Sequence, residues 1–198
     1  MFRSLQGYGY EVSFGVLKAT AFGVPQQRER LIVVAGRQQV GLPVGSFDCP
    51  RTVREAIGHL PDKPITILNH KTMKLSPENL ERIKTLRPGE NSRVHGQSFA
   101  DSYARMAWDK PAPTITTKCI SFSNGRFGHP KYHRGLTIRE AAILQGFPAS
   151  FEFVGSLWSC ARQVGNAVPP PIAFALGKHI LAIEQKLRIR RVRRRRVS

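Results

Sequence analysis

The stretch "GVPQQRERLIVVAG" (residues 23–36) joins a polar segment to the longest apolar run in the chain. That run ends at a glycine and is rich in β-branched residues, which predicts a fully buried β-strand. Just before it, Gln26, Arg28 and Arg30 occupy alternate positions, and period-two spacing points all three side chains to one side. Two guanidinium groups there suit a phosphate or a polarised carbonyl oxygen. A solvated strand end with Glu29 as a local partner explains the pattern equally well.

The segment upstream also has the pattern of a strand. Val12, Phe14 and Val16 alternate with other residues within the stretch 10–19, which predicts a half-buried strand. A loop with a glycine and a proline separates it from the strand at 30–36. The two strands are therefore expected to be neighbours.

Helix signals recur downstream. Two T-x-x-E capping boxes begin at Thr52 and Thr137, and Ser76 followed by Pro77 is a further N-terminal signal. Near the C-terminus, apolar residues recur at intervals of three or four, which is typical of an amphipathic helix. These signals predict helices within residues 52–61, 75–90, 136–148 and 171–187, and the stretch "APTITT" (112–117) predicts one more strand.

The chain is strongly basic. Lys and Arg total 31 against 13 Asp and Glu, which gives a net charge of +18 at pH 7. The segment "KLRIRRVRRRR" (186–196) carries eight cations and no acid, so subtracting eight from +18 leaves +10 on residues 1–185. A basic globular body favours a polyanionic partner, above all nucleic acid, over a merely solvated charged surface. The arginine-rich end is expected to be disordered.

The apolar runs and the cysteines of the sequence limit the class of protein that is expected. No apolar run is long enough to span a bilayer, and the N-terminus lacks an apolar signal region, so neither a membrane nor a secreted protein is expected. Cys49, Cys119 and Cys160 are widely spaced and form no CxxC pair, which suits reduced thiols in a cytoplasm. No metal site is predicted.

Two further stretches stand out in the last third of the chain. In "RQVGNAVPPPIA" (162–173), Gly165 and Asn166 predict a turn where the backbone can approach a ligand, and three prolines stiffen the segment after it. This pattern is typical of the edge of a small-molecule site, and a rigid lead-in to the next helix is the alternative. In "LTIREAAILQGFP" (136–148) we find no catalytic constellation, only a capped helix that packs inward.

Taken in order, "GVPQQRER" with "LIVV", "RGLTIREAAILQGFP" and "RQVGNAVPPPIA" resemble three successive blocks of the DNA cytosine-5 methyltransferases, in the C-terminal half of bacterial modification enzymes. The resemblance covers nearly the whole chain except the arginine-rich end. It implies an α/β fold, namely the C-terminal portion of a doubly wound Rossmann-like methyltransferase domain. That portion would contain the last two strands and the closing helices, with an irregular target recognition domain inserted.

The resemblance also implies roles for single residues. In the family, the arginines of the first block hold the flipped cytosine and its phosphates. The residues at these positions here are Arg28 and Arg30, and Gln26 would support them. A Thr-Ile pair in the variable region contacts the target region, which falls on Thr114 and Ile115. The middle block mainly braces the recognition domain.

The cofactor implied by the resemblance is S-adenosylmethionine, and the residues of the last block that would line it are Asn166, Ala167 and Val168. The family's glycine-rich cofactor loop, Pro-Cys nucleophile and Glu-Asn-Val block precede the first block, and this chain contains none of the three. Cys49 stands in the order Cys-Pro and follows the block. Because addition of a cysteine thiolate to C6 is what activates cytosine C5, we do not expect this chain alone to methylate DNA.

The expected function is therefore that of a C-terminal half or subunit of a DNA (cytosine-5-)-methyltransferase in a bacterial restriction–modification system. Double-stranded DNA and an N-terminal methyltransferase half are the expected partners, and the cytoplasm is the expected compartment. A catalytically inactive DNA-binding remnant is the alternative, and a non-functional fragment is a third possibility. The expected division is residues 1–37 and 131–185 for the catalytic domain, 38–130 for target recognition and 186–198 for the basic tail.

Overall fold

A computed structural model describes residues 2–63, 66–92 and 102–195, and for residues 188–195 the backbone. Helix α1 is followed by two strands with a short 3-10 helix between them, and the remaining elements are helical. Their bounds are α1 Phe2–Gly7, β1 Glu11–Lys18, η1 Ala19–Phe22, β2 Glu29–Gly36, α2 Val53–Ile57, α3 Pro77–Lys84, η2 Phe122–Asn124, α4 Ile138–Leu144, α5 Leu157–Asn166 and α6 Pro170–Arg195.

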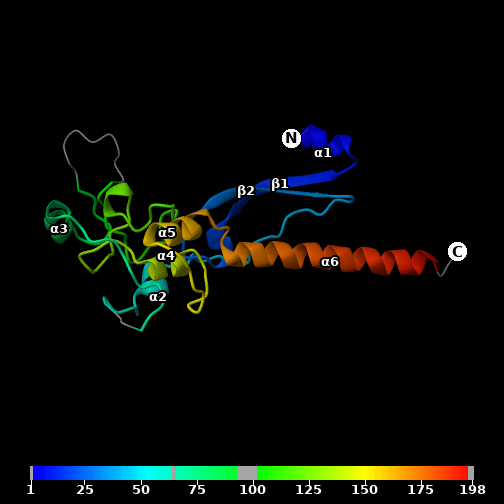
Figure 1. Cartoon of the computed structure of the whole chain (residues 1–198). Coiled ribbons are helices and arrows are strands. Elements are labelled where there is room, and N and C mark those ends of the chain that lie inside the picture. Colours follow the sequence, from blue (N-terminus) through cyan, green and yellow to red (C-terminus); the bar gives the residue numbers. More distant parts are fainter. Residues whose placement is uncertain (1, 64–65, 93–101, 196–198) are drawn as a thin grey trace.

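The elements form two parts (Figure 1). Strands β1 and β2 and the long helix α6 extend together to one side, and we call them the arm. Helices α2 to α5 and the irregular segments between them form the other part, which we call the body. The chain passes from the arm to the body between β2 and α2, and it returns to the arm between α5 and α6.

In the arm, β1 and β2 pair antiparallel along their whole length, from Glu11 opposite Gly36 to Lys18 opposite Glu29. The two predicted strands and their pairing are thus confirmed. One face of this hairpin packs against α6, where Leu17 is buried in a small core. That core comprises Leu17, Ala19, Val24 and Ile172, with Phe22, Ile32, Leu42 and Leu176 around it.

The full burial predicted for strand 30–36 is wrong, whereas β1 is half-buried as predicted, with one face covered and one open. Phe14, Val16 and Leu31 lie on the outer face of the hairpin and are 57–58% exposed, although strand 30–36 was expected to be fully buried. Both strands carry apolar residues on both faces, as in sheets that are covered by helices on each side. In the described chain the inner face is covered by α6 and by the segment around Leu42, and α1 contacts the outer face where Phe2 stacks on Phe14.

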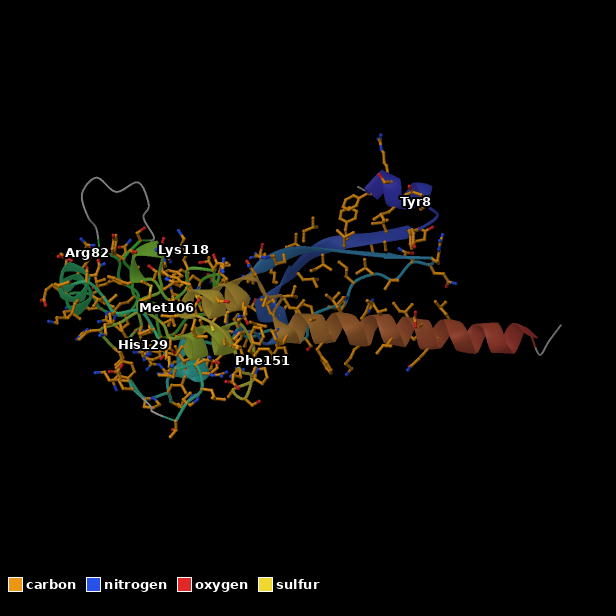
Figure 2. The ribbon with its side chains drawn as sticks, viewed as in Figure 1. Tyr8, Arg82, Met106, Lys118, His129 and Phe151 are labelled. Carbon is orange, nitrogen blue, oxygen red and sulfur yellow. The ribbon has the colours of Figure 1, made fainter. Side chains whose placement is uncertain are left out.

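The main hydrophobic core lies in the body (Figure 2). It joins α2, α4 and α5 to buried residues of the irregular segment, such as Met106 and Ile115. Both T-x-x-E sequences form the expected capping boxes, and Ser76 caps α3 with Pro77 at its first turn. The helices predicted from these signals are confirmed.

Two local predictions in the body are wrong. The stretch 112–117 forms no strand, because Ala112 makes only a single parallel bridge to Gln26 and the prolines on either side of it have no N–H to donate. Gly165 and Asn166 are not a turn but the last residues of α5. Ser156 caps this helix by accepting a hydrogen bond from the Ser159 N–H at 3.2 Å.

Helix α6 begins at the prolines, as predicted, and extends further than expected. Residues from 186 onward are predicted to be disordered, but the helix continues to Arg195. Leucine, isoleucine and arginine are all compatible with a helix, and cationic residues are favourable near its C-terminus. Within the described residues no helix is long and apolar enough to cross a membrane.

Candidate functional site

The polar residues before β2 lie where the arm meets the body. Gln26 is fully buried, and its amide contacts three segments of the chain. Its Oε1 accepts a hydrogen bond from the Ile115 N–H at 2.9 Å, and its Nε2 donates to the Leu144 carbonyl at 3.2 Å and to Gln145 Oε1. Gln26 therefore links the first block to the predicted recognition pair and to the end of α4.

Arg28 lies beside it and is 5% exposed. Its Nη1 donates to the Ile115 carbonyl at 2.9 Å, and its Nη2 donates to the carbonyls of Gly165 at 3.2 Å and Ala167 at 3.3 Å. Burial, and after it the charge of Arg30, lowers the pKa of the Arg28 guanidinium, which nevertheless stays charged. One guanidinium thus joins the first block, the recognition pair and the last block.

Arg30 differs from these two residues. It is exposed and donates to the carbonyl of its neighbour Glu29 at 2.7 Å. Strand β2 begins at Glu29, so Arg30 belongs to the strand while Gln26 and Arg28 precede it, and the prediction that the three side chains share one side stays a prediction. Of the two arginines, Arg30 is the one whose guanidinium is accessible to a solute.

A cavity of about 320 Å³ opens beside this cluster. Its lining includes Arg28, whose Nε is buried and has no hydrogen-bond partner in the part of the chain that is described. An ion pair of 3.6 Å joins Lys18 and Glu29 at the rim. The lining residues are Lys18, Thr20, Gln27, Arg28 and Glu29.

The predicted recognition pair is fixed to the first block. Thr114 is half-buried and its hydroxyl donates to the Gln27 carbonyl at 2.7 Å. Ile115 is fully buried, and both its N–H and its carbonyl are held by the first block.

The last block approaches the same place. Gly165 lies so close to residues 116 and 117 that a Cβ on it would lie 2.3 Å from the Thr117 nitrogen. After it, Asn166 and Val168 are exposed and Ala167 is half-buried. Pro169 is buried and its carbonyl accepts the first hydrogen bonds of α6, from the N–H groups of residues 172 and 173. The prolines do form a rigid lead-in to the helix, and a ligand contact at 166–168 stays a prediction.

Gln145 is the residue that sequence reasoning missed. It follows α4 and is fully buried. Its Nε2 donates to the carbonyls of Val164 at 3.1 Å and Ala167 at 2.9 Å, and its Oε1 accepts from Gln26. A glutamine in an otherwise apolar helix end was the available signal, because a buried amide needs partners.

The rest of the middle block forms a buried charge cluster. The two Nη groups of Arg134 donate to the two carboxylate oxygens of Glu140 at 2.8 Å each, and Arg134 Nε donates to Asp62 at 2.8 Å. Burial alone would raise the pKa of Glu140, but the Arg134 guanidinium lowers it below its usual value. This cluster ties α4 to the segment after α2, and the bracing role of the block remains a proposal that these contacts support.

His129 completes the cluster. Its Nδ1 accepts hydrogen bonds from the N–H groups of Lys131 and Tyr132, both at 3.0 Å, so the neutral ring carries its proton on Nε2. That Nε2 lies 3.6 Å from Glu140 Oε1. Burial lowers the pKa of His129 to about 4.

The three cysteines differ in their surroundings. Burial raises the pKa of Cys119 to about 12, so it stays a thiol at neutral pH, and Cys160 is also buried. Cys49 is exposed in an irregular segment. Among the described residues, no group of three or more His, Cys, Asp or Glu side chains is arranged to hold a metal ion.

Solved structures with a similar fold are methyltransferases. A DNA modification methyltransferase from an Escherichia coli prophage gives a TM-score of 0.69 at 22% identity, covering 93% of this chain and 63% of that one. Dnmt2 of Schizosaccharomyces pombe gives 0.62 at 16% identity, covering 93% and 61%. The chain thus shares a mixed α/β fold with these proteins.

The family is shown by the sequence itself. The model of the C-5 cytosine-specific DNA methylases matches residues 1–182, so the chain belongs to that family. It is 38% identical to the Type II methylase M.HgiDII of Herpetosiphon aurantiacus and 34% identical to the Type II methyltransferase M1.HphI of Haemophilus parahaemolyticus. The alignments cover 90% and 87% of this chain but only 57% and 48% of those proteins. The chain therefore matches about half the length of these relatives.

Proposed function

We propose that this chain supplies target recognition and part of the base and cofactor pockets of a DNA cytosine-5 methyltransferase, which transfers a methyl group to C5 of cytosine in duplex DNA. One observation carries the proposal. The first block, the recognition pair and the last block are far apart in the sequence and meet at Arg28, whose guanidinium contacts residues 115, 165 and 167 at 2.9–3.3 Å.

The two arginines of the first block have different tasks in this proposal. Arg30 is accessible, so its fork of donors can hold an oxygen or a phosphate of the nucleotide once it has been flipped out of the duplex. Arg28 donates to three backbone carbonyls and holds the segments that form the pocket together. Thr114 and Ile115 hold the recognition segment against the same pocket.

The loop 166–168 fits a role as a cofactor wall. Its exposed residues Asn166 and Val168 flank Ala167, whose carbonyl is held by two buried donors, so the loop is both accessible and fixed. S-adenosylmethionine would supply the electrophilic methyl group there. The task of these three residues is to orient that group, because the chain offers no glycine-rich loop for it.

The cysteine nucleophile must come from elsewhere, and the open surface of the arm is where we propose that the complementary part of the methyltransferase domain binds. The outer face of the hairpin exposes Phe14, Val16 and Leu31, and the outer side of α6 exposes Phe174 and Leu181 at 69% and 60%. An apolar surface of this kind marks an interaction site. About half of each of these two relatives lies outside its alignment with this chain, and a segment of that length could cover the surface.

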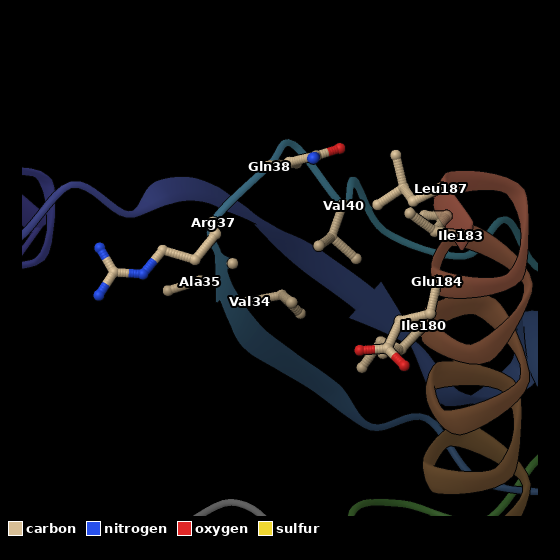
Figure 3. Close-up of a pocket in the computed structure, with 10 residues that line it drawn as sticks. Val34, Ala35, Arg37, Gln38, Val40, Ile180, Ile183, Glu184 and Leu187 are labelled. Carbon is tan, nitrogen blue, oxygen red and sulfur yellow. The ribbon is translucent and has the colours of Figure 1, made fainter. Parts of the chain in front are cut away.

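A groove at the far end of the arm, between β2 and α6, is a second opening (Figure 3). It has a volume of about 470 Å³ and lies between the end of β2 and α6. Val40, Ile183 and Leu187 lie together on one side, and Arg37 points away from α6. The lining of this groove is mainly apolar, which suits a segment of the same complementary part.

Reconstitution tests the proposal. The chain is combined with the N-terminal part of the Herpetosiphon relative, and methyl transfer to duplex DNA is measured with labelled S-adenosylmethionine. We expect activity from the mixture and none from either part. Arg30→Ala should lower kcat by about 100-fold or more with little change in duplex affinity, and Arg30→Lys should recover part of the loss. Equal losses of affinity and turnover would contradict the pocket role.

An inactive DNA-binding protein is the second candidate, favoured by the net charge of +10 that remains on residues 1–185 without the tail. It predicts that the chain alone binds duplex DNA with a steep salt dependence. Sequence-selective binding by the chain without any transfer after reconstitution would favour this candidate over the enzyme.

A further inference from the structure

A closed ring of hydrogen bonds joins the recognition pair to the loop after α5. On one route, the Ile115 carbonyl accepts from Arg28 at 2.9 Å, and Arg28 donates to the Ala167 carbonyl at 3.3 Å. On the other, the Ile115 N–H donates to Gln26, Gln26 donates to Gln145, and Gln145 donates to the same Ala167 carbonyl at 2.9 Å. Both peptide groups of one residue are thus tied to a single carbonyl 52 positions away, the difference between 167 and 115.

The ring has little freedom to absorb a displacement. Its three side chains, Gln26, Arg28 and Gln145, are between 0% and 5% exposed, and buried hydrogen-bond networks of this kind hold one arrangement. Inside it, Gly165 has no room for a Cβ, since that atom would lie 2.3 Å from the backbone of residues 116 and 117. The end of α5 and the residues that follow the recognition pair are therefore in close backbone contact as well.

We propose that Arg28 and Gln145 are positioning residues that couple duplex binding at the recognition segment to the conformation of the loop 166–168. The inference rests on the function proposed above and deepens it. A duplex that shifts residues 114 and 115 shifts one end of the ring, and the Ala167 carbonyl at the other end moves with it. By linkage, a ligand that binds the loop changes duplex affinity by the same factor.

The coupling is measured in the full chain by amide hydrogen exchange at residues 164–168, with and without DNA. The probe is the duplex most enriched when the chain selects from a random-sequence library, used at saturation so that every variant is equally occupied. In the native chain the duplex should slow exchange at 164–168 by at least about fivefold, the lower range of typical couplings. In Gln145→Leu the slowing should fall below about twofold, because one route of the ring is lost.

A matched control lies on α5. Gln163 also donates to a carbonyl, that of Val154 at 2.9 Å, but outside the ring, so Gln163→Leu should keep the full slowing. If Gln145→Leu fails to fold, Arg28→Lys replaces it, because lysine keeps the charge and loses the fork that reaches both Ile115 and Ala167.

Each outcome decides the matter. Equal slowing in the native chain and in the ring variants overturns the coupling while leaving DNA recognition intact. Loss of slowing in Gln163→Leu as well shows general loosening and also overturns it. If no duplex is enriched, DNA recognition by this chain is itself contradicted, and the coupling with it.

Discussion

The body and the arm use similar apolar residues with opposite results. In the body, Ile57, Ile83 and Leu144 are completely buried, whereas in the arm Leu31 and Leu181 are 58% and 60% exposed. Figure 2 shows the same contrast, with Met106 among dense side chains and Tyr8 standing clear of them. The body encloses the main hydrophobic core, whereas the arm has one face of its sheet and one side of its helix still to cover. Stability and assembly are therefore carried by different parts of the molecule.

The largest expected effect comes from an ion pair in the body. Glu140→Gln leaves the Arg134 guanidinium without its bidentate, fully buried partner, and we expect a loss of about 3–5 kcal/mol in the free energy of unfolding. The arm offers the matched change, Glu29→Gln, in an ion pair whose side chains are 69% and 60% exposed. That variant should lose at most about 1 kcal/mol. Urea denaturation of both variants checks the contrast, and equal losses would contradict it.

The second-largest expected effect is a loss of stability of the body at acidic pH. His129 has its pKa lowered from 6.5 to about 4 by burial, so the folded state keeps it neutral while the unfolded chain takes up a proton. Its contribution is complete above pH 6.5 and is lost as the pH falls from 6.5 toward 4, by up to about 3 kcal/mol. His129→Asn keeps an acceptor for the two backbone N–H groups and cannot titrate, so it should flatten the dependence of stability on pH. An unchanged slope would remove His129 as the cause.

Two glycine substitutions sharpen the comparison further. Gly165→Ala places a Cβ 2.3 Å from the backbone of the body and should cost about 1–3 kcal/mol. Gly177→Ala on α6 meets nothing within 4 Å and should stabilise the chain by about 0.5–1 kcal/mol, because alanine is the better helix former. Thermal unfolding shows the two signs directly, and a loss at Gly177 would mean that the outer side of α6 is already covered.

The smallest effect on stability is expected on the open face. Leu31→Ala should change the stability of the chain by no more than about 0.5 kcal/mol, whereas Leu17→Ala on the covered face should lose about 2–3 kcal/mol. After reconstitution with the complementary part, Leu31→Ala should weaken the association. If instead it abolishes self-association of the chain alone, a second copy covers this face.

The sequence predicted the helices of the body well because their signals are local. Thr52, Ser76 and Thr137 fix helix starts through contacts within four residues, and all three were recognisable. The two strands were also predicted, but the exposure of their outer face was not. Apolar residues on both faces of a strand are typical of a sheet covered by helices on both sides, whereas the described chain covers one side.

The candidate site was predicted in part. The blocks that meet at the site were recognised, and the structure brings Gln26, Arg28 and Ile115 together as hydrogen-bonded neighbours. The difference in burial between Arg28 and Arg30 was not predicted, because side-chain alternation does not show which residues the rest of the chain covers. Gln145 was missed because its partners lie 19, 22 and 119 positions away, beyond any local pattern.

The contacts of Arg28 also bear on the order in which the molecule is built. Its partners Ile115, Gly165 and Ala167 lie 87, 137 and 139 positions further along the chain. The hairpin can form soon after residue 36 leaves the ribosome, but the guanidinium has no acceptor for a long interval of synthesis. Contacts between distant residues form slowly, since the intervening chain must first lose its freedom. The pocket therefore forms late in synthesis, and a product cut short before residue 165 would carry every residue of the first block without the carbonyls of Gly165 and Ala167 that hold Arg28.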